Sequence, residues 1–183
     1  MPDTHYAALL HADAQAHARR RQPLRLILIF LAVFFALQYA WEMSRDTWLE
    51  RTVIDHATVM PAAWLINALG SAAPVHADAY RIVSPLARLN IRNGCEGLET
   101  LFLLVAAFFS QPFPWKVRLC GIGLGTLLVY GLNQARIVIL WHAWLDQRNL
   151  FGVLHGSVLP LAMIAVCLAY FLVFLTRHES HPA

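Results

Sequence analysis

Three residues that could together transfer an acyl group stand in short polar motifs beside long apolar runs. The motifs are Asn93-Gly94-Cys95-Glu96-Gly97-Leu98-Glu99, Asn133-x-x-Arg136-Ile137 and Leu154-His155-Gly156. A thiol attacks a carbonyl carbon as the thiolate, and a histidine can exchange the proton with the thiol and the leaving amine. A fixed arginine can stabilise the oxyanion that develops on the carbonyl oxygen. Cys95, Arg136 and His155 are therefore the candidate catalytic residues.

Two further residues are candidates for a supporting role. Asn133 precedes Arg136 by one helical turn on the same face, where it could orient the arginine or a substrate. Glu99 shares a helical face with Cys95, and it could pair with Arg136, orient His155 or interact with the dipole of a helix start. His142 is a rival base, but its spacing from Arg136 turns it to a different face.

The composition indicates an integral membrane protein. Of the 183 residues, 58% are hydrophobic and only 14% are charged, with a mean hydropathy of +0.52, whereas soluble domains carry about a quarter charged residues. The net charge of +3 comes from basic residues that flank apolar runs, so nucleic-acid binding is not expected. Cys95, Cys120 and Cys167 lack the spacing of a disulfide framework or a metal site, and no cofactor is expected.

The apolar runs predict an all-α polytopic fold of about four to five spans, with an interfacial or extended outer segment before the second span. Four expected spans run through residues 24–41, 95–109, 119–145 and 155–175. Each is long enough, or nearly so, for the ~30 Å hydrocarbon core. Residues 1–23 are expected to form a cytoplasmic N-terminal tail, 24–175 the transmembrane catalytic domain and 176–183 a cytoplasmic C-terminal tail.

The stretch between the first two spans leaves the topology open. Residues 57–75 are moderately apolar but contain prolines and polar residues, which favours a helix in the interface or a re-entrant piece. Alternation in residues 80–91 predicts a short strand. The distribution of Lys and Arg alone favours a fifth span through residues 57–75, whereas length and composition favour four. Four spans place both termini in the cytoplasm.

Either topology brings the three reactive side chains to the same side of the bilayer. Cys95 lies about 22 Å of helix before Ser110, and Arg136 lies about 26 Å of helix after Leu119. The proline-containing loop between these two runs gives them a common starting depth, and His155 begins the last run.

Each candidate residue also has a purely structural interpretation. Cys120 and Cys167 stand among Leu, Gly and Ala, as expected of small apolar fillers. An arginine inside an apolar run costs at least about 2.5 kcal/mol to insert, which an ion pair with Glu96 or Glu99 could offset. The alternative function is a non-enzymatic small membrane transporter or assembly subunit with a buried Arg/His cluster. Cys95 separates the two functions, because a transporter needs no thiol beside a helix start.

The three motifs, in this order and spacing, resemble the exosortase/archaeosortase family, and most closely its exosortase H branch. The resemblance covers roughly residues 24–175. It implies a cysteine transpeptidase of the bacterial inner membrane, with Cys95 as nucleophile, Arg136 as transition-state stabiliser and His155 as acid and base. It also implies a periplasmic active site. Many exosortases have serine where Glu96 stands, which bears on substrate preference.

The resemblance also implies a class of partners. These are membrane-anchored proteins that end in a short motif, a transmembrane helix and a basic cluster. In the exosortase H branch the motif is similar to Ile-Pro-Thr-Leu-x-x-Trp-Gly. The enzyme would cleave at the motif through a thioacyl intermediate and pass the acyl group to an acceptor that could be water, a glycan or a lipid.

Overall fold

The computed structural model describes residues 3–71, 73–91, 95–146 and 148–179, and within these ranges the side chains of residues 23–178. In chain order, the helices and strands are α1 Asp3–Met43, α2 Trp48–Arg51, the π-helix η1 Thr52–Val59, α3 Met60–Ala68, β1 His76–Asp78, β2 Arg81–Val83, β3 Arg88–Asn90, α4 Leu98–Ser110, α5 Trp115–Asp146, α6 Arg148–Val153, the π-helical turn η2 Leu154–Val158 and α7 Leu159–Glu179.

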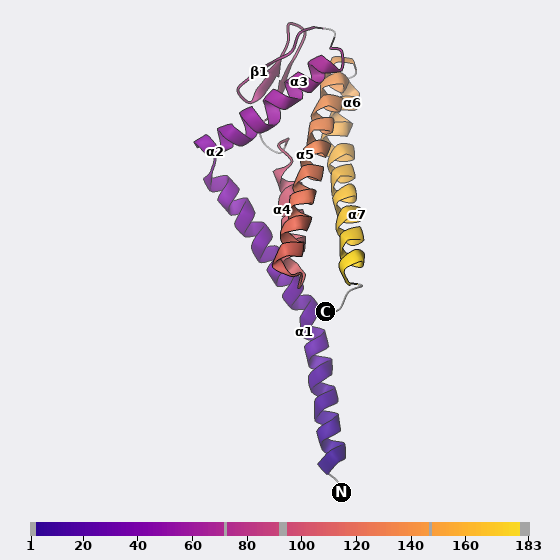
Figure 1. Ribbon diagram of the computed structural model, residues 1–183. Helices are drawn as coiled ribbons and strands as arrows, with labels where there is room; N and C mark the ends of the chain where they lie inside the picture. The colour runs from indigo at the N-terminus through magenta and orange to yellow at the C-terminus, as the bar shows by residue number, and fades with distance from the viewer. Residues whose placement is uncertain (1–2, 72, 92–94, 147, 180–183) are drawn as a thin grey trace.

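Helices α4, α5 and α7 run alongside one another as a bundle, and α1 leans against it at an angle (Figure 1). Helix α1 packs on α4, and α4, α5 and α7 pack on one another. The start of α1 and the end of α7 lie toward the same end of the bundle. Three segments are long and apolar enough to cross a membrane: Pro23–Met43, Trp115–Asp146 and Arg148–His178. The prediction of a multi-pass helical membrane protein is therefore confirmed.

Helix α4 is shorter than the predicted second span. Its 13 residues give about 20 Å of helix, less than the ~30 Å apolar core of a bilayer. Residues 95–97 are not helical, so Cys95 lies in a non-helical segment that leads into the bundle. The fourth span also differs from expectation, because the helix begins at Arg148, ahead of His155.

A helix and a small sheet cover the end of the bundle opposite the chain termini (Figure 1). Helices α2, η1 and α3 form one continuous helix from Trp48 to Ala68, which crosses this end at a steep angle to α5. The segment is not among the three helices long and apolar enough to span. The three strands pair antiparallel in the order β1-β2-β3, so the predicted short strand is in fact two strands of a three-stranded sheet.

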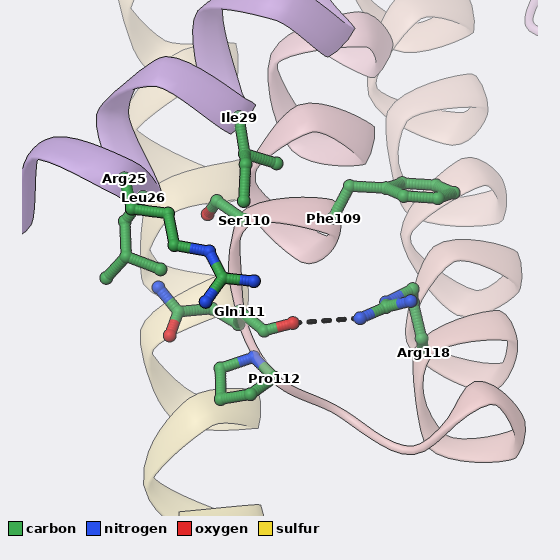
Figure 2. Close-up of a pocket in the computed structure, with 8 residues that line it drawn as sticks. All are labelled: Arg25, Leu26, Ile29, Phe109, Ser110, Gln111, Pro112 and Arg118. Carbon is green, nitrogen blue, oxygen red and sulfur yellow. Dashed lines mark hydrogen bonds between the residues drawn. The ribbon is translucent and has the colours of Figure 1, made fainter. Parts of the chain in front are cut away.

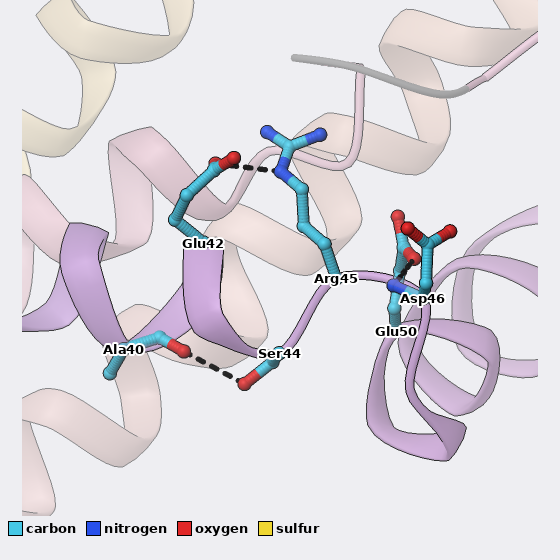
Figure 3. Close-up of polar contacts among 6 residues, drawn as sticks. All are labelled: Ala40, Glu42, Ser44, Arg45, Asp46 and Glu50. Atoms are coloured by element: carbon cyan, nitrogen blue, oxygen red, sulfur yellow. Dashed lines mark hydrogen bonds and ion pairs between the residues drawn. The ribbon is translucent and has the colours of Figure 1, made fainter.

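The turn from α1 to α2 is held by local polar contacts (Figure 3). Nε of Arg45 lies 2.7 Å from a carboxylate oxygen of Glu42, and the hydroxyl of Ser44 donates to the Ala40 carbonyl at 2.8 Å. The backbone N–H of Asp46 donates to the buried Glu50 carboxylate at 2.6 Å. These contacts fix where the chain leaves α1.

Two apolar clusters divide the interior. The cluster at the sheet end joins the crossing helix, the sheet and α5, and it includes Ile66, Ile82, Trp141 and Cys95. The second lies within the bundle around the fully buried Phe108, whose ring contacts the Phe171 and Phe174 rings of α7. Cys95 thus belongs to the apolar cluster through which the crossing helix and the sheet pack on α5.

Candidate active site

Cys95 is held in the non-helical segment before α4. Its side chain is 6% exposed and packs in the cluster at the sheet end. Helix α4 begins at Leu98, with Gly97 as its N-cap residue at φ 76°. A positive φ is easily adopted only by glycine, which explains the residue type here. Cys95 is therefore close to the start of α4 but not in its first turn.

Asn133 packs directly against the segment that carries the cysteine. A Cβ placed on Gly97 would lie 2.9 Å from Cγ of Asn133, which is itself only 2% exposed. Any side chain at position 97 would displace Asn133 or the segment itself. Oδ1 of Asn133 is buried and has no hydrogen-bond partner among the described residues. Asn133 thus supports the segment that carries Cys95, and its Oδ1 has the capacity to accept a hydrogen bond.

His155 reaches Cys95 from the last helical segment. Sγ of Cys95 lies 3.6 Å from Nδ1 and 4.0 Å from Nε2 of His155. His155 belongs to η2, where the Leu159 N–H donates to the Leu154 carbonyl. Such π-turns widen a helix locally and are frequent at functional sites.

Phe151 fixes the orientation of the imidazole. Its ring stacks on that of His155, with centroids 5.4 Å apart and planes 20° apart. Phe151 in turn packs on the cluster that contains Cys95. The stacking of these two rings could have been predicted from the sequence, because residues four apart, such as Phe151 and His155, are neighbours on one face of a helix.

Arg136 supplies the positive charge of the site. It is only 6% exposed and is one of the buried residues of α5. The charge acts on both the Cys95 thiol and the His155 imidazole. Cys95, Arg136 and His155 therefore come from three separate parts of the chain into one site.

Burial has the largest effect on the thiol, which lies outside the helices of the bundle. Burial raises the pKa of Cys95; the Arg136 charge lowers it, and the nearby Glu96 raises it. The sequence favoured a thiolate stabilised by a helix start and a cation. In the structure the cation is present, but desolvation by burial outweighs it, so the pKa of Cys95 lies above its ordinary value.

The remaining candidates lie elsewhere or outside the described residues. Glu99 is exposed, and it lines a cavity of about 700 Å³ together with Glu42 and Arg45. Nδ1 of His142 lies 2.9 Å from the carbonyl oxygen of Val138, one turn earlier in the same helix, and is within hydrogen-bond distance of it. The first two residues of the cysteine motif, 93 and 94, lie outside the described residues. Among described residues, no His, Cys, Asp and Glu cluster could hold a metal ion.

Comparison with protein families identifies the architecture. The family model described as Transmembrane exosortase (Exosortase_EpsH) matches residues 7–173, most of the chain. The chain belongs to the transmembrane exosortase family. No curated protein and no solved structure matches it. Exosortase membership indicates a membrane transpeptidase with a role in protein sorting, and the matched region contains all three residues of the cluster.

Proposed function

We propose that this exosortase is a cysteine transpeptidase of the exosortase H branch that removes C-terminal sorting signals from exported proteins. The observation that carries the proposal is the 3.6 Å separation between Sγ of Cys95 and Nδ1 of His155. A buried thiol whose pKa is raised needs a base in contact with it to form the thiolate, and His155 is the proposed base.

The proposed reaction begins with transfer of the thiol proton from Cys95 to His155. Sγ then attacks the scissile carbonyl carbon, and the negative charge on the carbonyl oxygen is stabilised by Arg136. As the tetrahedral intermediate collapses, His155 returns the proton to the leaving amine. The C-terminal tail departs, and the rest of the substrate stays on Sγ as a thioester. An acceptor nucleophile then loses a proton to His155 and takes the acyl group, which restores the thiol.

The proposed substrates are membrane-anchored proteins that end in a motif similar to Ile-Pro-Thr-Leu-x-x-Trp-Gly, a transmembrane helix and a basic cluster. The transmembrane helix of such a substrate confines its cleavage motif to the membrane that holds the enzyme. This raises the effective concentration of the motif at the active site. Asn133 acts as a positioning residue, because it packs on the Gly97 backbone. The proposed location is the bacterial inner membrane, with the site open to the periplasm.

The test is removal of the tail from a tagged substrate co-expressed with the enzyme. Cys95→Ala is expected to abolish processing, while Cys120→Ala, which changes an exposed cysteine on α5, is expected to process normally. Both proteins should be present in the membrane in equal amounts. Undiminished processing by Cys95→Ala would instead support the non-enzymatic alternative.

A further inference from the structure

A cavity of about 460 Å³ lies at the end of the bundle opposite the sheet. It opens between the first part of the α1 span, the end of α4 and the first turn of α5. Figure 2 shows two guanidinium groups pointing toward the Gln111–Pro112 segment, one from Arg25 on α1 and one from Arg118 on α5. None of its eight lining residues carries a carboxylate.

The guanidinium group of Arg118 is held in place by its neighbours, and its Nε–H has no acceptor among the described residues. One of its terminal nitrogens donates to the Gln111 carbonyl at 2.9 Å. Its guanidinium carbon lies 5.2 Å from the ring centroid of Phe109 and 4.7 Å from that of Trp115. Nε is buried and has no acceptor among the described residues. An N–H shielded from water in this way costs free energy unless a ligand accepts from it.

Arg25 faces the same cavity from the opposite wall. Its side chain is exposed and makes no hydrogen bond or ion pair with any described residue. It stands near the beginning of the apolar segment Pro23–Met43, and Arg118 near the beginning of the apolar segment Trp115–Asp146. Both cations therefore lie at the level where these two spans meet the membrane surface.

We propose that this cavity binds the phosphate of an anionic phospholipid. Two arginines without a neutralising acid form a site for a phosphoryl anion, which accepts charge-assisted hydrogen bonds from guanidinium groups. Basic pockets between transmembrane helices bind lipid head groups in this manner. Leu26, Ile29 and Phe109 give the same cavity an apolar wall, which suits the glycerol and upper acyl carbons of a lipid better than a free phosphate ester.

The bound phosphate would fasten α1 to the rest of the bundle. Helix α1 packs chiefly on α4, and the cavity separates its first span residues from α5. A phosphate held by Arg25 and Arg118 bridges α1 to α5 at this end, far from Cys95. The proposal is therefore independent of the proposed reaction.

The test measures thermal unfolding of the purified full chain in neutral detergent. Phosphatidylglycerol is expected to raise the Tm by at least about 4 °C, and phosphatidylcholine to have little effect. The Arg25→Gln/Arg118→Gln protein should lose this rise, whereas Lys116→Gln should keep it, because Lys116 has the same charge at the same end of α5 but does not line the cavity. An equal rise in the double variant and the native chain would overturn the proposal.

Two further experiments distinguish a lipid phosphate from free phosphate and test the site with a variant that is expected to fold normally. Inorganic phosphate at matched concentration is expected to leave the Tm unchanged; a rise equal to that with phosphatidylglycerol would overturn the assignment to a lipid. Arg25→Gln alone changes an exposed residue, and in native mass spectrometry it should reduce the number of bound phosphatidylglycerol molecules. Unchanged occupancy in this variant contradicts the site.

Discussion

Sγ of Cys95 lies 3.6 Å from Nδ1 of His155, although 60 residues separate them in the chain. The contact depends on two departures from regular helix. Residues 95–97 are non-helical, and Cys95 packs there in the apolar core, while His155 belongs to the π-turn η2. Phe151 then limits the rotation of the imidazole. These features give the following predictions.

Replacing the proposed base should slow the reaction. His155→Gln is expected to reduce tail removal by about 10²–10⁴-fold, since a positioned acid and base contributes that much. His142→Gln is the matched control, because His142 bonds to the Val138 carbonyl of its own helix. The initial rate of substrate processing in membranes checks both. A large loss in the His142 variant with normal processing by the His155 variant would assign the base to His142.

The backbone at Gly97 should tolerate no side chain. Gly97→Ala forces a residue with a Cβ to keep φ near 76° and brings that Cβ within 2.9 Å of Asn133. The left-handed conformation alone costs roughly 1–2 kcal/mol, and the clash shifts the segment that carries Cys95. Processing should therefore fall sharply, with a lower Tm.

Gly123→Ala is the control for this substitution. Gly123 lies in α5, and a Cβ there meets nothing within 4 Å. Its processing rate should match that of the native chain and its Tm should be equal or higher, because alanine is favoured over glycine in helices. Equal behaviour of the Gly97 and Gly123 variants would mean that the Gly97–Asn133 contact does not support the site.

Reactivity of the Cys95 thiol should depend on pH in a predictable direction. Burial raises its pKa, so alkylation by iodoacetamide should reach half of its maximal rate at a higher pH than for an ordinary cysteine. Glu96→Gln removes a negative charge and should shift this midpoint down. Arg136→Gln removes a positive charge and should shift it up.

These shifts are measured by mass spectrometry of the alkylated protein in a background with Cys120 and Cys167 replaced by alanine. A midpoint in the native sequence below that of a free cysteine would show that the thiolate is favoured at rest. A downward shift in Arg136→Gln would show that this arginine does not act on the thiol.

The orientation of the chain can be tested with single cysteines at opposite ends. His76→Cys lies on the exposed strand β1 at the sheet end, and Lys116→Cys lies at the other end of the bundle. In a background without the native cysteines, a membrane-impermeant maleimide should label position 76 in spheroplasts. Position 116 should react only after the membrane is opened. The reverse pattern contradicts a periplasmic site.

The sequence was sufficient to predict the helical membrane fold and to single out Cys95 and His155, whose side chains lie within 3.6 Å of each other. Long apolar runs report directly on spans, and Cys95, Arg136 and His155 stood out because charged or reactive groups are rare in such runs. The common depth of Cys95 and Arg136 was predicted from helix rise, although α4 begins only at Leu98 and the residues from Cys95 to Gly97 are not helical.

Other features depend on tertiary packing, which local patterns do not encode. The π-turn at His155 and the start of α4 at Leu98 are not predicted by the local pattern of residues. The same holds for the pKa of Cys95: the sequence displays Arg136 and Glu96, but the dominant effect is burial beneath the sheet end, which only the fold reveals. Glu99 shares a face with Cys95 in an ideal helix, yet the segment between them is partly non-helical.

The central claim is that the acyl group is carried by Sγ of Cys95. The most direct measurement is mass spectrometry of the enzyme after it is quenched in acid during turnover, with the adduct mapped by proteolysis. The predicted result is the mass of the truncated substrate on the peptide that contains Cys95, released by hydroxylamine as expected for a thioester. An adduct on Cys120, Cys167 or a serine, or one that resists hydroxylamine, would contradict this account.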